Sequence, residues 1–197
     1  MTNYYILKAD LDDHFHNFEV DYDSKELDHY FNANKFFSPD FSSDGWKTVE
    51  LHEFKEYEEY LPVEDGKVIR PSLWPNIMHV WGAPTFVFSQ ALKNDLSGIL
   101  GNCGYFLEAE YHGEPWYFYY CNVHLSNALD LKLSEYDVFE NGRIMSLHTA
   151  VLVRDVIKNT DIFRASEYTN RLFVSDRVKA IIDKHFVGNV FKLVEVV

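Results

Sequence analysis

The residues best suited to chemistry form one short run near the amino terminus, Asp12-Asp13-His14-Phe15-His16. In an extended strand, side chains two apart share a face, so His14 and His16 could together ligate a transition metal. With Asp12 and Asp13, such a site would suit a small metal-dependent hydrolase. Zinc sites use three or four protein ligands, however, and no further ligand follows nearby. The favoured interpretation is an acidic surface loop, with no metal and no cofactor.

Other catalytic signatures are missing from the sequence. Ser89 and Ser175 each follow a short apolar run, but neither has the flanking glycines of a nucleophile elbow. A serine in that position is a favoured helix cap. There is no HExxH and no glycine-rich phosphate loop. We therefore assign no catalytic residue and do not expect an enzyme.

The two cysteines, Cys103 and Cys121, are too far apart in sequence for a CxxC motif. Apolar residues surround both, which favours buried free thiols. A disulfide between them stays open if their strands pair in register. Few cysteines, no signal peptide and no run of 18 apolar residues together predict a cytoplasmic protein without a membrane segment.

Charge is distributed unevenly along the chain. Residues 1–65 hold seventeen acidic and five basic residues, a balance of −12 against −13 for all 197 residues. A surface built from this segment would attract a basic protein and repel nucleic acid. An ordinary solvated surface is the alternative interpretation.

Aromatic residues among these acids could anchor a partner inside a charged rim. The predicted contact residues are Trp46, Glu50, Glu53, Glu56, Tyr57, Glu58, Glu59, Tyr60, Trp74 and Trp81. A third hypothesis is a regulatory protein that binds a small ligand near Trp74 and Trp81. A homo-oligomer is left open.

The elements that must position these residues indicate an α+β fold with a mixed, largely antiparallel sheet, hairpins and a few amphipathic helices. Apolar runs at 86–88 and 172–174 predict buried strands, each followed by a helix capped by Ser89 or Ser175. Residues 105–111 and 116–123 predict an aromatic-rich hairpin. We expect a single domain, 1–197, with an acidic portion 1–65, a Pro/Trp-containing loop 66–84 and a core 85–197.

Several segments resemble a bacterial immunity-protein family of polymorphic and contact-dependent toxin systems. The segments, in chain order, are Pro75-Asn76-Ile77, residues 86–92, residues 116–123, residues 127–130 with Lys132 and Ser134, Asp161-Ile162-Phe163-Arg164, residues 172–179 and residues 187–191. The resemblance covers about 120 residues from Pro75 onward and only a short opening strand before it. It implies an antitoxin-like cytoplasmic inhibitor that binds and neutralises a cognate toxin, and it carries no catalytic residues.

Overall fold

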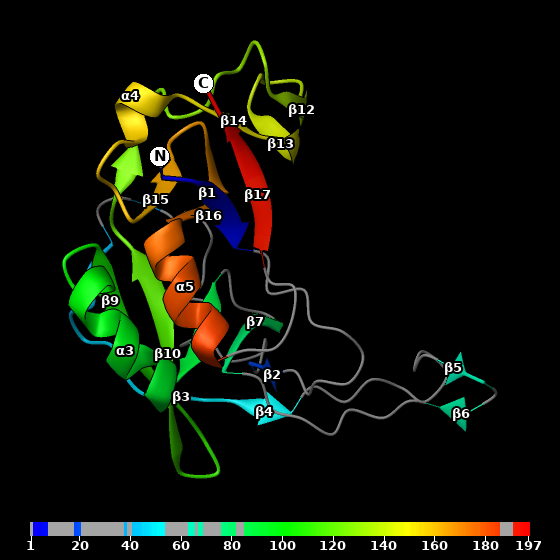
Figure 1. Cartoon of the computed structure of the whole chain (residues 1–197). Coiled ribbons are helices and arrows are strands. Elements are labelled where there is room, and N and C mark those ends of the chain that lie inside the picture. The colour runs from blue at the N-terminus through cyan, green and yellow to red at the C-terminus, as the bar shows by residue number, and fades with distance from the viewer. Residues whose placement is uncertain are drawn as a thin grey trace.

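The computed structural model describes residues 2–7, 18–20, 38, 41–53, 63–65, 67–68, 76–81, 85–185 and 191–197. These residues form two large sheets and two longer helices that share one apolar cluster with both sheets (Figure 1). Most neighbouring strands run antiparallel, and four pairs are parallel. The predicted α+β class is confirmed. No helix in these described ranges is long and apolar enough to cross a membrane.

The seven-stranded sheet has the order β3-β9-β10-β8-β7-β2-β4. Its strands are β2 (Phe18–Glu19), β3 (Val49–Glu50), β4 (His52–Glu53), β7 (Ile77–Trp81), β8 (Phe86–Ser89), β9 (Gly104–Tyr111) and β10 (Glu114–Cys121). The two end strands, β3 and β4, are separated in the chain by Leu51 alone. Residues 49–51 bond to β9, and residues 52–53 bond to β2. The sheet therefore closes on itself through the segment 49–53, which we call the closing segment.

The closed sheet has an apolar interior. Alternation along the closing segment buries Val49 and Leu51 and leaves Glu50 and His52 exposed. The interior also receives side chains from the other strands and from Val20: Phe18, Val80, Val87, Leu107, Ala109, Phe118 and Tyr120.

The six-stranded sheet has the order β11-β15-β16-β1-β17-β14. Its strands are β1 (Tyr4–Leu7), β11 (His124–Leu125), β14 (Val151–Leu152), β15 (Ile162–Ala165), β16 (Tyr168–Ser175) and β17 (Phe191–Val196). The first strand, β1, lies between β16 and β17, so this sheet joins the two ends of the chain (Figure 1). A one-turn helix, α4 (Arg154–Ile157), packs on its outer face.

Helices α3 (Gln90–Leu100) and α5 (Asp176–His185) lie side by side and pack against each other, α3 on the seven-stranded sheet and α5 on the six-stranded sheet (Figure 1). Leu92, Leu96 and Leu100 of α3 share one apolar cluster with Val178 and Ile182 of α5 and with residues of both sheets. Side chains spaced four apart lie on one helical face, which explains this contact.

Both predicted strand–helix units are confirmed, since residues 86–88 and 172–174 are buried strand residues followed by α3 and α5. Ser89 caps α3 by accepting the Leu92 amide at 3.3 Å. Ser175 also precedes its helix, but its hydroxyl donates to Asp161 Oδ1 at 2.6 Å. The cap predicted at Ser175 is therefore replaced by a bond between β16 and the start of β15.

The predicted hairpin is also confirmed, with a shorter turn than expected. β9 and β10 pair over their full length, and only His112 and Gly113 connect them. Both residues have positive φ, 50° and 80°. That pair of conformations belongs to the tight turn whose twist matches two antiparallel strands.

The sequence predicts a loop over residues 66–84, but parts of this segment form strands. It contains the internal strand β7 and the strand β6 (Lys67–Val68), which pairs with β5 (Val63–Glu64) away from the two sheets (Figure 1). Ile77 and Val80 are completely buried on opposite faces of β7. The prolines flank this strand and do not interrupt it.

The last strand pair is a hairpin, β12 (Glu135–Val138) and β13 (Ile144–Thr149), which lies beside β17 and β14 in Figure 1. Lys192 of β17 donates to the His148 carbonyl at 2.8 Å. This bond connects the hairpin to the six-stranded sheet.

Cys121 is fully buried, whereas Cys103 is half-buried, a correction to the prediction that both are buried. Both are free thiols. Burial raises the pKa of Cys121 to about 11 and raises that of Cys103 as well. Because the thiolate is the reactive form, both thiols should react slowly, Cys121 the more so.

We predict that native protein at pH 8 reacts with a maleimide or iodoacetamide first at Cys103. A pKa near 11 leaves roughly a hundredfold less thiolate at Cys121 than in a free cysteine. Mass spectrometry of tryptic peptides over time measures both rates. Equal rates at Cys103 and Cys121 in folded protein would contradict this assignment of burial.

Two glycines give a matched test of packing. A Cβ on Gly104 would lie 1.9 Å from the Tyr120 carbonyl oxygen, whereas a Cβ on Gly98 in α3 would meet nothing within 4 Å. Gly104→Ala should therefore destabilise the protein by about 3 kcal/mol. Gly98→Ala should stabilise it by about 1 kcal/mol, because alanine is the better helix former. Urea unfolding measures both free energies, and a Gly104→Ala variant as stable as the wild type would contradict the close β9–β10 contact at this position.

Candidate partner-binding site

Three carboxylates line the outer face of the closed sheet where β3 meets β9. The parallel register places Glu50 opposite Glu110, and two residues earlier on each strand Thr48 lies beside Glu108. Glu50, Glu108 and Glu110 are all exposed. Their inward neighbours Val49, Leu107 and Ala109 are buried, so alternation fixes the outward direction of the acids. We call Glu50, Glu108 and Glu110 the acidic strip.

The acidic strip is not neutralised within the described part of the chain. No ion pair or hydrogen bond there involves the side chain of Glu50 or Glu110. Glu108 accepts a hydrogen bond from the Thr48 hydroxyl at 3.4 Å. Like charges directly opposite each other on neighbouring strands destabilise a sheet. The Glu50–Glu110 pair is thus an unfavourable arrangement that the fold tolerates.

Trp46 holds the closing segment beside β9. Its indole N–H donates to the Glu108 carbonyl at 2.9 Å, and its ring meets Phe118 edge-on at 6.2 Å. The Leu51 amide donates to the Glu110 carbonyl at 2.7 Å. Trp46 is half-buried, and these contacts fix the position of the acidic strip.

One end of the closed sheet is ringed by aromatic side chains. Phe18 is completely buried, and its ring centroid lies 4.9 Å from those of Tyr111 and Trp116. Glu53 pairs with Phe18 across β2 and β4. Burial, and after it the negative charge of Glu53, raises the pKa of the Tyr111 phenol. Glu53 therefore lies near Tyr111 at this end.

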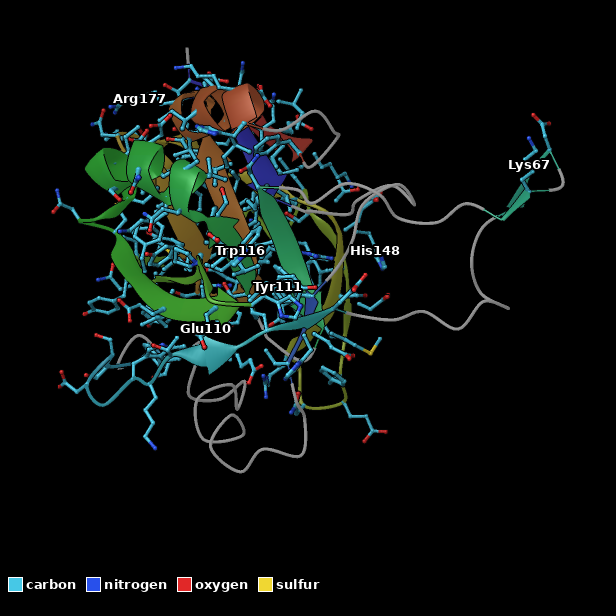
Figure 2. All side chains as sticks on the ribbon, turned by 90° about the horizontal axis from the view of Figure 1, so that it is seen from below. Lys67, Glu110, Tyr111, Trp116, His148 and Arg177 are labelled. Atoms are coloured by element: carbon cyan, nitrogen blue, oxygen red, sulfur yellow. The ribbon has the colours of Figure 1, made fainter. Side chains whose placement is uncertain are left out.

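A cavity of about 460 Å³ opens beside these rings, between the β9–β10 hairpin and the first turn of α3. We call it the hairpin pocket. It is lined by Asn76, Ser89, Gln90, Ala91, Tyr111, Glu114, Pro115 and Trp116. Pro115 pairs with Glu110 of the acidic strip, so strip and pocket are continuous. Figure 2 shows Trp116 and Tyr111 in neighbouring positions with Glu110 beside them.

The predicted contact residues fall into three groups. Trp46, Glu50 and Glu53 come together around the closing segment. Trp81 ends β7, where its backbone pairs with that of Glu19. The others lie outside the described residues: Glu56, Tyr57, Glu58, Glu59, Tyr60 and Trp74.

Sequence reasoning did not select Glu108, Glu110, Glu114 or Trp116 for this site. The useful signal was the alternation in Glu108-Ala109-Glu110, which puts both acids on one face of a strand. The pairing of that strand with the closing segment could not be read from the sequence.

The Asp12, Asp13, His14 and His16 cluster also lies outside the described residues. Within the described ranges, no three His, Cys, Asp or Glu side chains are grouped to hold a metal ion.

A serine, a histidine and an aspartate do meet on the β12–β13 hairpin. Ser146 Oγ donates to Asp137 Oδ2 at 2.8 Å, and His148 Nε2 lies 2.8 Å from the same oxygen. In a catalytic triad the histidine stands between the other two, with one ring nitrogen on each. Here the hydroxyl donates to the carboxylate, so the grouping does not have triad geometry.

The profile of one protein family matches residues 53–196, most of the chain, and its description is Immunity protein family (Imm11). The chain therefore belongs to this immunity protein family, which confirms the resemblance seen in the sequence. Membership implies a toxin as the partner. No curated protein matches the chain. The matched region contains Glu53, Glu108, Glu110 and the hairpin pocket but not Glu50.

If Glu50 and Glu110 repel each other, removing either charge should stabilise the protein. We predict that Glu50→Gln and Glu110→Gln each raise the Tm by about 1–3 °C at low salt. The gain should shrink at 1 M NaCl, because salt screens exposed charges. Differential scanning calorimetry measures the shift.

Glu135→Gln is the matched control, since Glu135 faces Thr149 across a strand pair and accepts its hydroxyl at 2.9 Å. This substitution should leave the Tm unchanged or lower it. A fall in Tm for Glu50→Gln and Glu110→Gln would contradict the proposed repulsion.

Proposed function

We propose that this immunity protein binds and neutralises a cognate secreted bacterial toxin, and that the acidic strip is part of the docking surface. The observation that carries the proposal is the opposition of Glu50 and Glu110 with no neutralising partner among the described residues. A basic surface on the toxin would relieve this repulsion and convert an unfavourable arrangement into a favourable one. Inhibition then proceeds by occlusion and requires no catalytic residue.

The charges at the opposite side of the molecule support this choice of surface. Arg177 pairs with Asp161 at 2.8 Å, and Lys179 pairs with Asp183 on α5. Arg164 is buried. Acidic and basic side chains there form ion pairs, whereas the acids of the strip have no basic partner among the described residues. Figure 2 shows Arg177 far from Glu110.

The proposal extends along the chain beyond Glu53. Glu56, Glu58 and Glu59, with Tyr57 and Tyr60, follow the closing segment and would enlarge the same surface. Trp74 and Trp81 remain proposed contacts on the same grounds. We further propose that residues 1–197 act as one domain, because one apolar cluster draws on both sheets. The cytoplasm of the producing cell is the proposed location, as the family resemblance implies.

The experiment measures association with the cognate toxin domain. Glu50→Gln with Glu110→Gln should slow association by about tenfold at low salt, since exposed charges act mainly on the encounter rate. Dissociation should change less. Stopped-flow or surface plasmon resonance at 20 mM and 300 mM NaCl gives both rates.

The control removes two acids from the six-stranded side, Asp155→Asn with Glu195→Gln, and so changes the net charge equally. This variant should associate almost as fast as the wild type. Equal slowing by both double variants, or a rate that salt does not change, would rule out the acidic strip as the docking surface.

A further inference from the structure

Three polar side chains that line the hairpin pocket already have hydrogen-bond partners within the protein. Ser89 Oγ donates to Asn76 Oδ1 at 2.6 Å, and Asn76 Nδ2 donates to the His185 carbonyl at 2.7 Å. Gln90 accepts the Tyr117 hydroxyl at 2.6 Å and donates to Asn94 at 2.7 Å. These side chains are therefore already engaged in hydrogen bonds within the protein.

Two lining groups remain without a described partner. The carboxylate of Glu114 has no ion pair or hydrogen bond within the described ranges, and the same holds for the indole N–H of Trp116. The rest of the lining is apolar surface from Trp116, Tyr111, Pro115 and Ala91. The pocket thus offers an apolar wall and one uncompensated negative charge, with Glu110 next to it.

We propose that the hairpin pocket receives one long cationic side chain of the toxin, an arginine in preference to a lysine; this rests on the proposed function. The aliphatic stem of such a side chain packs on apolar surface while its charged head stays near a carboxylate. A guanidinium also stacks on the face of an aromatic ring, where tryptophan is the strongest acceptor. Aromatic residues with cationic partners are typical anchors of protein interfaces.

The size and position of the pocket fit this occupant. At about 460 Å³ it lies within the range of roughly 300–1,000 Å³ that is usual for ligand pockets. It is continuous with the acidic strip, so a basic toxin surface over Glu50 and Glu110 would bring its side chains to the pocket.

One feature of the pocket opposes a cation. The amino end of α3 borders it, and a helix start carries roughly half a positive charge. Ser89 already satisfies one amide there, that of Leu92. Glu114 and Glu110 contribute two full negative charges, which exceed the helix contribution. Because the negative charge at the pocket exceeds the positive charge of the helix start, the pocket favours a cation over an anion.

The inference can be tested without the toxin. Capped tripeptides Gly-Arg-Gly, Gly-Lys-Gly, Gly-Leu-Gly and Gly-Glu-Gly are titrated into ¹⁵N-labelled protein. The indole N–H signal of Trp116, assigned with Trp116→Phe, reports binding. The arginine peptide should shift this signal with a Kd on the order of millimolar, and more tightly than the lysine peptide. The leucine and glutamate peptides should shift it least.

Glu114→Gln should weaken arginine-peptide binding by roughly three- to fivefold, because an exposed ion pair is modest in strength. Glu135→Gln, on the β12–β13 hairpin, is the control and should leave binding unchanged. Binding of the glutamate peptide would identify an anion site at the start of α3 and overturn the proposal. Absence of arginine-peptide binding up to 50 mM would also overturn it.

The toxin separates this inference from the proposed function. If both hold, Glu114→Gln and Trp116→Phe speed dissociation, whereas the Glu50 and Glu110 substitutions mainly slow association. A second outcome is that the Glu50 and Glu110 substitutions slow association while Glu114→Gln and Trp116→Phe leave dissociation unchanged. That result would support the acidic strip as the docking surface and overturn the pocket inference. If neither set changes the rates, the proposed docking surface itself fails.

Discussion

The site described here depends on the pairing of the closing segment with β9. Five residues, 49–53, contact β9 on one side and β2 on the other, and so join the two ends of the seven-stranded sheet. The hydrogen bonds from Leu51 to Glu110 and from Trp46 to Glu108 fix the register of this closure. A slip by one residue would turn Val49 and Leu51 outward and bury Glu50. The closed interior therefore determines that the acids face solvent.

Closure also explains why a charged surface and an aromatic pocket occur together. The strands that carry Glu108 and Glu110 outward carry Leu107 and Ala109 inward, toward Phe18 and Phe118. At the end of the sheet the interior rings become partly accessible at Tyr111 and Trp116. The closing segment runs directly from β3 into β4 and so occupies both end positions of this sheet. Recognition can then use its outer face and its rim.

The six-stranded sheet stabilises this arrangement from the other side. Its face packs through α3 and α5 onto the outer surface of β8 and β10. His185 at the end of α5 lies 2.8 Å from Asp95 of α3, and its carbonyl accepts Asn76 from the start of β7. These contacts connect α5 to both α3 and the closed sheet near the hairpin pocket.

Local signals in the sequence predicted local structure well. The apolar runs 86–88 and 172–174 and the Ser89 cap were predicted because strand propensity and capping act over a few residues. The aromatic hairpin followed from alternation and its glycine turn. The expected cap at Ser175 is wrong because its hydroxyl donates to Asp161, a residue fourteen positions away that a local pattern does not include. β7 was missed because its flanking prolines suggested a loop.

Only part of the candidate site could be predicted from the sequence, because the rest of it depends on contacts between distant segments. Acidic and aromatic residues near 46–53 stand out in the sequence, and Glu50 and Glu53 were selected on that basis. Glu108, Glu110 and Trp116 join them through strand pairings across about sixty residues, which composition cannot reveal. The Immunity protein family (Imm11) match covers these later strands but not Glu50. The candidate docking surface thus combines matched and unmatched parts of the chain.

Hydrogen–deuterium exchange of the protein with and without its toxin tests the docking surface most directly. We expect amides of the closing segment and of the β9–β10 hairpin, residues 49–53 and 104–116, to gain protection on binding. Amides of β12, β13 and α5 should exchange as in the free protein. Protection confined to the β12–β13 hairpin or to α5, with none at 49–53 and 104–116, would contradict the account.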